Sequence, residues 1–192
     1  MTKNFFFPLN IFYTLQTTKP IVWTNQTNLP NHYYIFIPNT WQFSINKILQ
    51  KDLFFSQTQL LETSAIDTLK YWSINSDFDL FIKKNRIILF YTYFSFFNKL
   101  RLTFLYLNNK SNNTKFTSID SMFKNANWLE REVAEMYGLN FLLKSDTRKL
   151  LLDYTFTEFP LLKDFTCEHS QDVYYNIFEE RVSYIRNNII EL

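Results

Sequence analysis

The stretch RIILFYTYFSFFNKLRLTFLYL, residues 86–107, decides the fold class of this chain. Aromatic and β-branched residues dominate both halves, Arg86–Phe97 and Leu100–Leu107, and such residues favour strands. Asn98 and Lys99 stand between the halves, and asparagine tolerates the left-handed conformation that a tight hairpin turn requires. The stretch therefore predicts two antiparallel strands joined by a two-residue turn.

A second stretch, Ser118–Tyr137, carries the period of a helix, in one piece or in two. Asp120 or Ser121 can cap its N-terminus, and Gly138 stands where glycine ends helices in the left-handed conformation. The residues expected to form one apolar stripe are Trp128, Leu129, Val133, Met136 and Tyr137. The charged residues of this segment are expected mostly on its other faces.

Upstream of these stretches, shorter signals predict three more elements. Tyr33–Ile37 has the pattern of a strand that a proline ends. Asn39 or Thr40 can then cap a helix over Trp41–Lys51, in which apolar residues recur at helical spacing. Phe54–Glu62 is a further strand candidate.

Together these elements predict an α+β fold, a small, mostly antiparallel sheet packed with two or three helices and followed by an extended C-terminal tail. Residues 1–32, which hold three prolines and show no clear period, are interpreted as an N-terminal arm. Residues 33–138 form the α+β domain. Residues 139–192 form the tail, which is expected to wrap a partner subunit instead of folding on itself. Val173–Phe178 and Arg181–Ile185 predict a late hairpin within it.

The composition is that of a globular chain with an aromatic bias. The 192 residues include 22 Phe and 12 Tyr but only one Gly, and the hydrophobic fraction of 46% is enough for a core. Phe, Tyr, Asn, Ile and Lys have A/T-rich codons, so we expect an A/T-rich genome such as that of an organelle. The first residues lack a signal-peptide cleavage site and the arginines of a transit peptide, which favours synthesis inside the organelle.

Cysteine and histidine are too few for many kinds of metal and redox site. Cys167 is the one cysteine, so the chain cannot form an intramolecular disulfide, and with His32 and His169 it cannot supply an iron–sulfur cluster or a structural zinc site. The net charge of +2, without a block of like charges, is too small for strong steering of nucleic acid. The longest nearly apolar run, residues 87–97, is too short for a transmembrane helix.

The segment ANWLEREVAEMYG, residues 126–138, closely resembles the signature of the thirty-kilodalton, subunit-C-type component of respiratory complex I, and the resemblance spans roughly residues 33–185. Ala134 stands where that family has Trp, and Glu158-Phe159 stands where it has Gly-His. The residues that match the signature, and that the resemblance implies for a partner interface, are Trp128, Glu130, Arg131, Glu132, Glu135, Met136, Tyr137, Gly138, Lys144, Arg148, Lys149, Pro160, Leu161, Lys163 and Asp164.

The resemblance implies a non-redox scaffold subunit of the peripheral arm, which supports electron transfer from NADH to ubiquinone in the proton-translocating NADH:ubiquinone oxidoreductase. It implies that this chain has no catalytic residue and binds no cofactor, and that FMN, iron–sulfur clusters and ubiquinone belong to neighbouring subunits. The implied partners are the forty-nine-kilodalton subunit, the twenty-kilodalton subunit and other peripheral-arm subunits. The implied location is the matrix side of the mitochondrial inner membrane.

Several charged residues have two interpretations each. Glu130, Arg131 and Glu132 can form a buried ionic network that fixes the helix against a partner, or they can be a solvated helix face. Arg131 and Glu135 stand four residues apart, where an ion pair along the helix can form. Glu132 with Glu135 is weak grounds for a metal site, because no histidine lies at helical spacing from them.

Two other functions compete with the scaffold. A mitochondrial ribosomal or RNA-binding protein would share the size and the mild basicity, and aromatic residues on the strands of residues 86–107 can stack on bases. A soluble metal-dependent enzyme is a third hypothesis, which the shortage of ligand residues opposes.

Overall fold

The computed structural model describes residues 21–23, 32–51, 58–69, 86–107, 115–166 and 171–186. Cys167 and His169 lie outside the described residues. So do most of residues 1–32 and residues 54–57, with which one of the predicted strands begins.

Five strands form the central sheet, in the order β1-β2-β5-β4-β3. Their bounds are β1 (Ile21–Trp23), β2 (His32–Pro38), β3 (Thr58–Asp67), β4 (Ile87–Ser95) and β5 (Leu100–Leu107). Strands β2 and β5 run parallel, whereas the pairs β1–β2, β3–β4 and β4–β5 are antiparallel, which confirms a mostly antiparallel sheet. The strand predicted at Phe54–Glu62 extends further along the chain than expected, because its pairing with β4 continues until Asp67 faces Ile87.

The turn between β4 and β5 differs from the prediction of two residues. Ser95 pairs with Leu100, so the connection has the four residues 96–99. Lys99, and not Asn98, adopts the left-handed conformation, with φ of 52°. The Asn98 amide instead donates a hydrogen bond of 3.4 Å to the Ser95 hydroxyl.

The first helical segment agrees with its predicted range but not with its predicted cap. A 3-10 turn, η1 (Asn39–Trp41), leads into helix α2 (Gln42–Lys51). The residue before the turn, Pro38, makes no side-chain capping bond. The Asn39 amide donates to the Lys115 carbonyl at 2.9 Å, which ties the start of this segment to a strand far along the chain.

Helix α4 (Ala126–Tyr137) is shorter than the predicted helix over Ser118–Tyr137, since residues 118–125 form turns. The predicted caps Asp120 and Ser121 are wrong, because the residue at the N-cap position is Asn125, which makes no side-chain capping bond. Its amide donates to the Leu60 carbonyl of β3 at 2.6 Å instead. Gly138 ends the helix as predicted, with φ of 70° and its N–H bonded to the Ala134 carbonyl.

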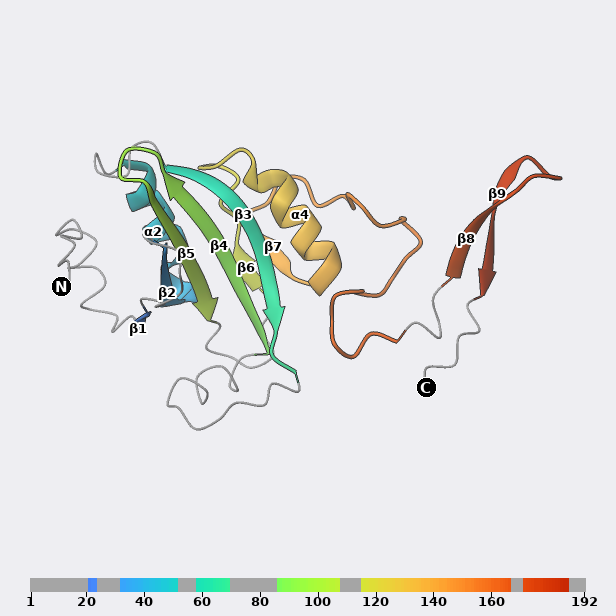
Figure 1. Ribbon diagram of the computed structural model, residues 1–192, viewed down its shortest axis with the longest axis horizontal. Helices are drawn as coiled ribbons and strands as arrows, with labels where there is room; N and C mark the ends of the chain where they lie inside the picture. The colour runs from blue at the N-terminus through green and yellow to red at the C-terminus, as the bar shows by residue number, and fades with distance from the viewer. Residues whose placement is uncertain are drawn as a thin grey trace.

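Both helices lie on one face of the sheet and share its main core (Figure 1). Helix α2 contributes Ile45 and Leu49, and helix α4 contributes Ala126 and Val133. The side chains that the sheet contributes to this face are Ile35, Ile37, Leu60, Ala65, Leu89, Tyr91, Tyr93, Leu102, Phe104 and Tyr106. A smaller cluster on the opposite face contains Phe36, Ile88, Leu105 and Leu107.

The C-terminal part begins with a small parallel pair, β6 (Lys115–Thr117) and β7 (Asn140–Leu142). The chain then runs without regular secondary structure to residue 166. The predicted late hairpin is present as β8 (Gln171–Asn176) and β9 (Arg181–Arg186), which pair antiparallel. Figure 1 shows this hairpin standing away from the central sheet.

Candidate functional site

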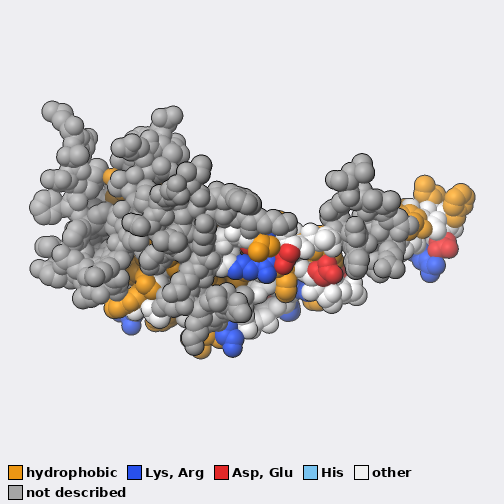
Figure 2. All heavy atoms as spheres, turned by 90° about the horizontal axis from the view of Figure 1, so that it is seen from below, with side chains coloured by type: hydrophobic (Ala, Val, Ile, Leu, Met, Phe, Trp, Pro, Cys, Tyr) orange, Lys and Arg blue, Asp and Glu red, His pale blue; other side chains and the backbone are white. Residues whose placement is uncertain are grey.

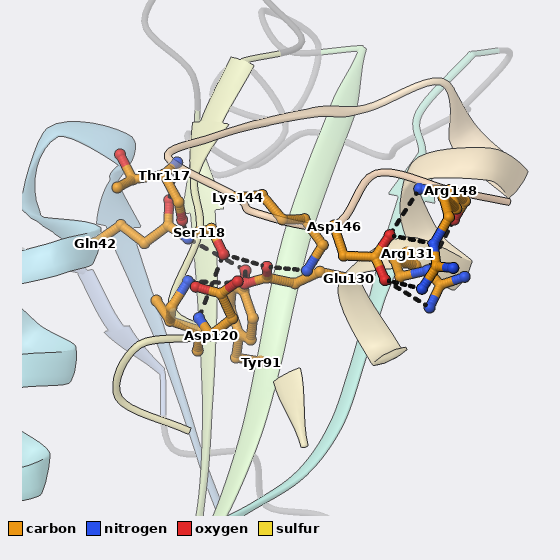
Figure 3. Close-up of polar contacts among 11 residues, drawn as sticks. Gln42, Tyr91, Thr117, Ser118, Asp120, Glu130, Arg131, Lys144, Asp146 and Arg148 are labelled. Atoms are coloured by element: carbon orange, nitrogen blue, oxygen red, sulfur yellow. Dashed lines mark hydrogen bonds and ion pairs between the residues drawn. The ribbon is translucent and has the colours of Figure 1, made fainter. Parts of the chain in front are cut away.

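The carboxylate of Glu130, on helix α4, lies at the centre of a buried polar cluster (Figure 3). The residue is 0% exposed and its carboxylate accepts four hydrogen bonds. Two come from the segment before the helix, the Ser118 hydroxyl at 2.6 Å and the Ile119 N–H at 2.9 Å. The others come from the Tyr91 hydroxyl of β4 at 3.1 Å and from Lys144 Nζ at 3.1 Å. Because the Lys144 side chain is only 2% exposed, the two charges form a buried ion pair.

The cluster continues through Tyr91 to helix α2. Gln42 Nε2 donates to the Tyr91 hydroxyl at 3.2 Å and to the Thr117 carbonyl at 2.7 Å. The Thr117 N–H donates back to Gln42 Oε1 at 3.2 Å. Burial, and then the nearby Glu130 carboxylate, raises the pKa of Tyr91 well above its usual value. One chain of hydrogen bonds thus joins both helices, β4 and β6.

Arg131 fastens the segment after β7 to the outer side of helix α4. Its guanidinium donates to the carbonyls of Arg148 at 2.7 Å and Lys149 at 3.0 Å, and it pairs with Asp146 at 3.4 Å. Asp146 also accepts two bonds from the Arg148 guanidinium, at 3.0 and 2.8 Å (Figure 3). These bonds, and the Arg131 charge, hold the pKa of the Asp146 carboxyl well below its usual range.

Glu135 fixes the next residues of the same segment through their backbone. Its carboxylate accepts the N–H groups of Leu150 at 2.9 Å, Leu151 at 2.7 Å and Leu152 at 3.4 Å. The predicted pairing of Glu135 with Arg131 is therefore replaced by two separate sets of contacts. The weak case for a metal site at Glu132 and Glu135 is also lost, because backbone amides occupy the Glu135 oxygens and Glu132 is exposed.

The end of helix α4 receives a later part of the chain. The Leu161 N–H donates to the Met136 carbonyl at 3.1 Å, next to Pro160. A Cβ on Gly138 would lie 2.8 Å from Phe159 Cε2, so the aromatic ring packs directly against the glycine. The absence of a side chain at Gly138 thus permits both the left-handed helix end and this close approach.

A final set of contacts ties residues 163–164 to the ends of β3 and β4. The Lys163 N–H donates to the buried Asp67 carboxylate at 3.0 Å. Arg86 pairs with Asp164 at 2.6 Å and with Asp67 at 3.6 Å. The hydrogen bond that Arg86 donates to Asp164, more than the nearby charges, raises the pKa of Arg86. Residues 139–166, which the sequence assigned to an extended tail, are thus bound to the domain at several points.

The structure shows where the charged signature residues lie within this chain. Glu130 and Arg131 belong to an ionic network, as one interpretation held, and the partners that the structure shows for them lie in this chain. Glu132 is solvated, as the other interpretation held. Trp128, predicted within the apolar stripe, is 65% exposed, whereas Leu129, Val133 and Tyr137 of that stripe contact the core.

The other predicted site residues line the segment that helix α4 holds. Lys149 Nζ donates to the carbonyls of Asp153 and Phe156, which closes a small loop. Arg148 and Leu161 remain exposed at the surface. The aromatic residues considered for base stacking are unsuited to it on the helix-covered face, where Tyr91 and Tyr93 are fully buried.

The sequence analysis missed several residues that take part in these contacts, among them Gln42, Asp67, Arg86, Tyr91 and Asp146. Arg86 gave a usable signal, as a charged residue at the start of a predicted strand. Among the described residues, no group of three or more His, Cys, Asp or Glu side chains could hold a metal ion. No helix in the described part of the chain is long and apolar enough to cross a membrane.

Comparison with known proteins identifies the family. Residues 35–171 match the family described as "Respiratory-chain NADH dehydrogenase, 30 Kd subunit". NADH-ubiquinone oxidoreductase subunit 9 of Paramecium primaurelia is 35% identical, over 98% of this chain and 88% of its own length. The protein of the same name from Dictyostelium discoideum is 28% identical, over 82% and 79% of the two chains.

Two solved structures share the fold at low sequence identity. A trypsin-resistant fragment of Nqo5 superposes with a TM-score of 0.55 at 16% identity, over 72% of this chain and 97% of the fragment. A chain of the membrane-bound sulfane sulfur reductase, an archaeal respiratory membrane complex, gives a TM-score of 0.60 at 14% identity, over 82% and 84%. The helix signature, the fold and the long family match agree. The chain therefore belongs to the family of the 30-kilodalton subunit of respiratory-chain NADH dehydrogenase, complex I.

Proposed function

We propose that this chain is a non-redox scaffold in the peripheral arm of mitochondrial complex I, and that its C-terminal hairpin docks on the forty-nine-kilodalton subunit. The observation that supports this most is the exposed apolar face of the β8–β9 hairpin. Its register places Val173 opposite Tyr184 and Tyr175 opposite Val182. These four side chains lie on one face, and each is more than half exposed.

A hairpin of this kind needs a partner. Two strands alone are at best marginally stable in water. The hairpin touches the rest of the chain through the Tyr184 hydroxyl, which donates to Asp153 at 3.3 Å. Phe178 and Ile177 at its turn are 98% and 77% exposed, and Figure 2 shows hydrophobic side chains gathered at this end of the molecule. Docking on another subunit would bury this surface.

The contacts of helix α4 explain how the scaffold would act. Arg131 and Glu135 hold residues 146–152, from which the chain continues to the hairpin. The buried ion pair of Lys144 with Glu130 ties the start of this part of the chain to helix α4, and the Tyr91 hydroxyl of β4 bonds to the same carboxylate. The hairpin would therefore be tethered to a fixed body. A neighbouring subunit that lines a quinone cavity would keep the geometry of that cavity better when it packs against such a rigid body.

The redox chemistry is assigned to other subunits. Iron–sulfur clusters would be bound by neighbours, because one cysteine cannot supply a cluster. The family resemblance implies that FMN and ubiquinone are also bound by neighbours. This chain would contribute surface and no catalytic group to the transfer of electrons from NADH to ubiquinone. The twenty-kilodalton subunit is the second partner that the family resemblance implies, on the matrix side of the inner membrane. The abundance of residues whose codons are A/T-rich supports synthesis inside the organelle.

The test is blue-native electrophoresis of gently solubilised membranes, with in-gel NADH dehydrogenase staining and mass spectrometry of the stained band. We expect this chain in the stained band together with other peripheral-arm subunits. Finding it with ribosomal subunits instead would refute the proposal.

A variant then tests the fastening of the tail. Arg131→Ala should lower the amount of assembled complex and leave quinone reduction per complex unchanged, because it releases the bonds to residues 146–149. Trypsin should also cut the isolated variant faster after Arg148 and Lys149. Glu132→Ala, on the same helix but exposed, is the matched control. Normal assembly with slow quinone reduction in Arg131→Ala would contradict a scaffold role.

A further inference from the structure

The turn between β4 and β5 presents two adjacent aromatic side chains to solvent. Phe96 is 56% exposed and Phe97 is 78% exposed. The Phe96 ring packs edge-on against Phe94, with centroids 5.0 Å apart, and so has a fixed support. Burial of large apolar side chains by a partner lowers the free energy of the complex.

The backbone holds this turn in one arrangement. Its two ends, Ser95 and Leu100, pair with each other and are both buried. Lys99 adopts the left-handed conformation, which costs a residue other than glycine free energy and is often found at binding sites. The flanking strands β4 and β5 are interior strands of the five-stranded sheet. The tip is therefore organised before any partner binds, which lowers the entropy that binding costs.

The tip is also positively charged. Residues 86–107 contain Arg86, Lys99 and Arg101 and no acidic residue. Arg86 pairs with Asp164 at the other end of these strands, whereas Lys99 and Arg101 are exposed beside the aromatic pair. A symmetric contact with the same tip of a second copy would bring like charges together, so self-association through this surface is disfavoured.

From this combination we propose that Phe96, Phe97, Lys99 and Arg101 form a second docking site, which inserts Phe97 into an apolar pocket with a carboxylate rim on a neighbouring protein chain. Figure 1 shows this turn at the opposite end of the molecule from the β8–β9 hairpin. The chain would then bridge two different surfaces of its surroundings. The inference rests on the proposed function only for the setting, a multisubunit complex.

Footprinting tests the site directly. The full chain in isolation and the same chain in the purified complex are labelled with a photogenerated carbene, and labelling of Phe96 and Phe97 is compared. We expect labelling of both residues to be severalfold lower in the complex, because a covering partner excludes the reagent. A carbodiimide should also link Lys99 to a carboxylate of another chain, at a surface that the β8–β9 hairpin does not contact. Equal labelling in both states would overturn the proposal.

Variants separate this site from folding and from the proposed function. Phe97→Ser and Lys99→Glu should reduce incorporation into the complex and leave the thermal midpoint of the isolated chain unchanged, because both side chains are exposed. Lys47→Glu reverses an exposed charge on helix α2 and is the matched control. If the chain is absent from the complex, the proposed function fails. If it is present with Phe97 still labelled, only this second site fails.

Two other occupants give distinct results. Binding of the full chain to phosphatidylglycerol vesicles that is lost in Phe97→Ser would identify a membrane surface and overturn the protein pocket. Oligomers of the isolated chain in mass photometry that are lost in Phe97→Ser would identify a second copy, docked head to tail through the acidic turn at Glu179 and Glu180. We expect the isolated chain to be a monomer that does not bind the vesicles, and we expect Phe97 to be protected from labelling in the complex.

Discussion

Replacement of Glu130 by glutamine tests whether its buried carboxylate holds helix, sheet and C-terminal segment together. The carboxylate is fully buried and accepts four hydrogen bonds, one of them from the almost fully buried Lys144 ammonium. Glutamine keeps the volume but removes the charge, and its own N–H groups face groups that donate. Removal of one partner from a buried ion pair costs about 3–5 kcal/mol. That is a large part of the roughly 5–15 kcal/mol by which a domain is stable.

Urea unfolding of the full chain, followed by far-ultraviolet circular dichroism, measures this loss. Glu132→Gln, on the exposed side of the same helix, is the control and should change the free energy of unfolding by less than about 0.5 kcal/mol. The double variant Glu130→Gln with Lys144→Met removes both charges of this buried pair, so it should recover about 2 kcal/mol of the loss. A loss below about 1 kcal/mol in Glu130→Gln, or no recovery in the double variant, would refute the reasoning.

Two further predictions concern the glycine and the buried phenols. Gly138→Ala should lower the free energy of unfolding by about 1–3 kcal/mol, because φ is 70° and the new Cβ meets the Phe159 ring. In a Phe159→Ala background the loss should fall to about 1 kcal/mol, and an equal loss in both backgrounds would contradict the steric part. Burial raises the pKa of three tyrosines, so their stabilising effect is complete below pH about 10, the unfolded value, and is lost as pH rises toward the folded values. Above pH about 10 the free energy of unfolding should then fall by about 4 kcal/mol per pH unit, and the phenolate absorbance should rise only as the chain unfolds. Phenolate formation before unfolding would contradict the burial of Tyr91, Tyr93 and Tyr106.

Local signals in the sequence were enough for β4, β5, the late hairpin and the helix end, but not for β1, β6 and β7. The aromatic and β-branched runs of residues 86–107 predicted β4 and β5, and the hairpin at residues 171–186 was predicted in the same way. Gly138 was predicted because the left-handed helix end is a local requirement that glycine meets. Each of these features depends on residues that are neighbours along the chain.

The buried polar cluster could not be predicted, because its partners are distant in the sequence. Periodicity assigns a carboxylate such as Glu130 to the solvent side of a helix. Burial becomes acceptable only when Lys144 and Tyr91 supply a charge and a hydroxyl, from 14 residues later and 39 residues earlier. The predicted length of the turn between β4 and β5 was wrong for a related reason. Its length follows from the pairing of Ser95 with Leu100, and not from Asn98 itself.

The inward direction of the signature charges changes what the signature of this family means for this chain. Glu130, Arg131 and Glu135 all bind residues 144–152 of the same chain, so they fasten this segment to helix α4. The exposed candidates for partner contact include Trp128, the β8–β9 hairpin and the turn at residues 96–99. Loss of Glu130, Arg131 or Glu135 should therefore impair assembly indirectly, through release of residues 144–152. Loss of an exposed hairpin residue should impair assembly while the stability of the isolated chain stays the same, and this contrast separates the two roles.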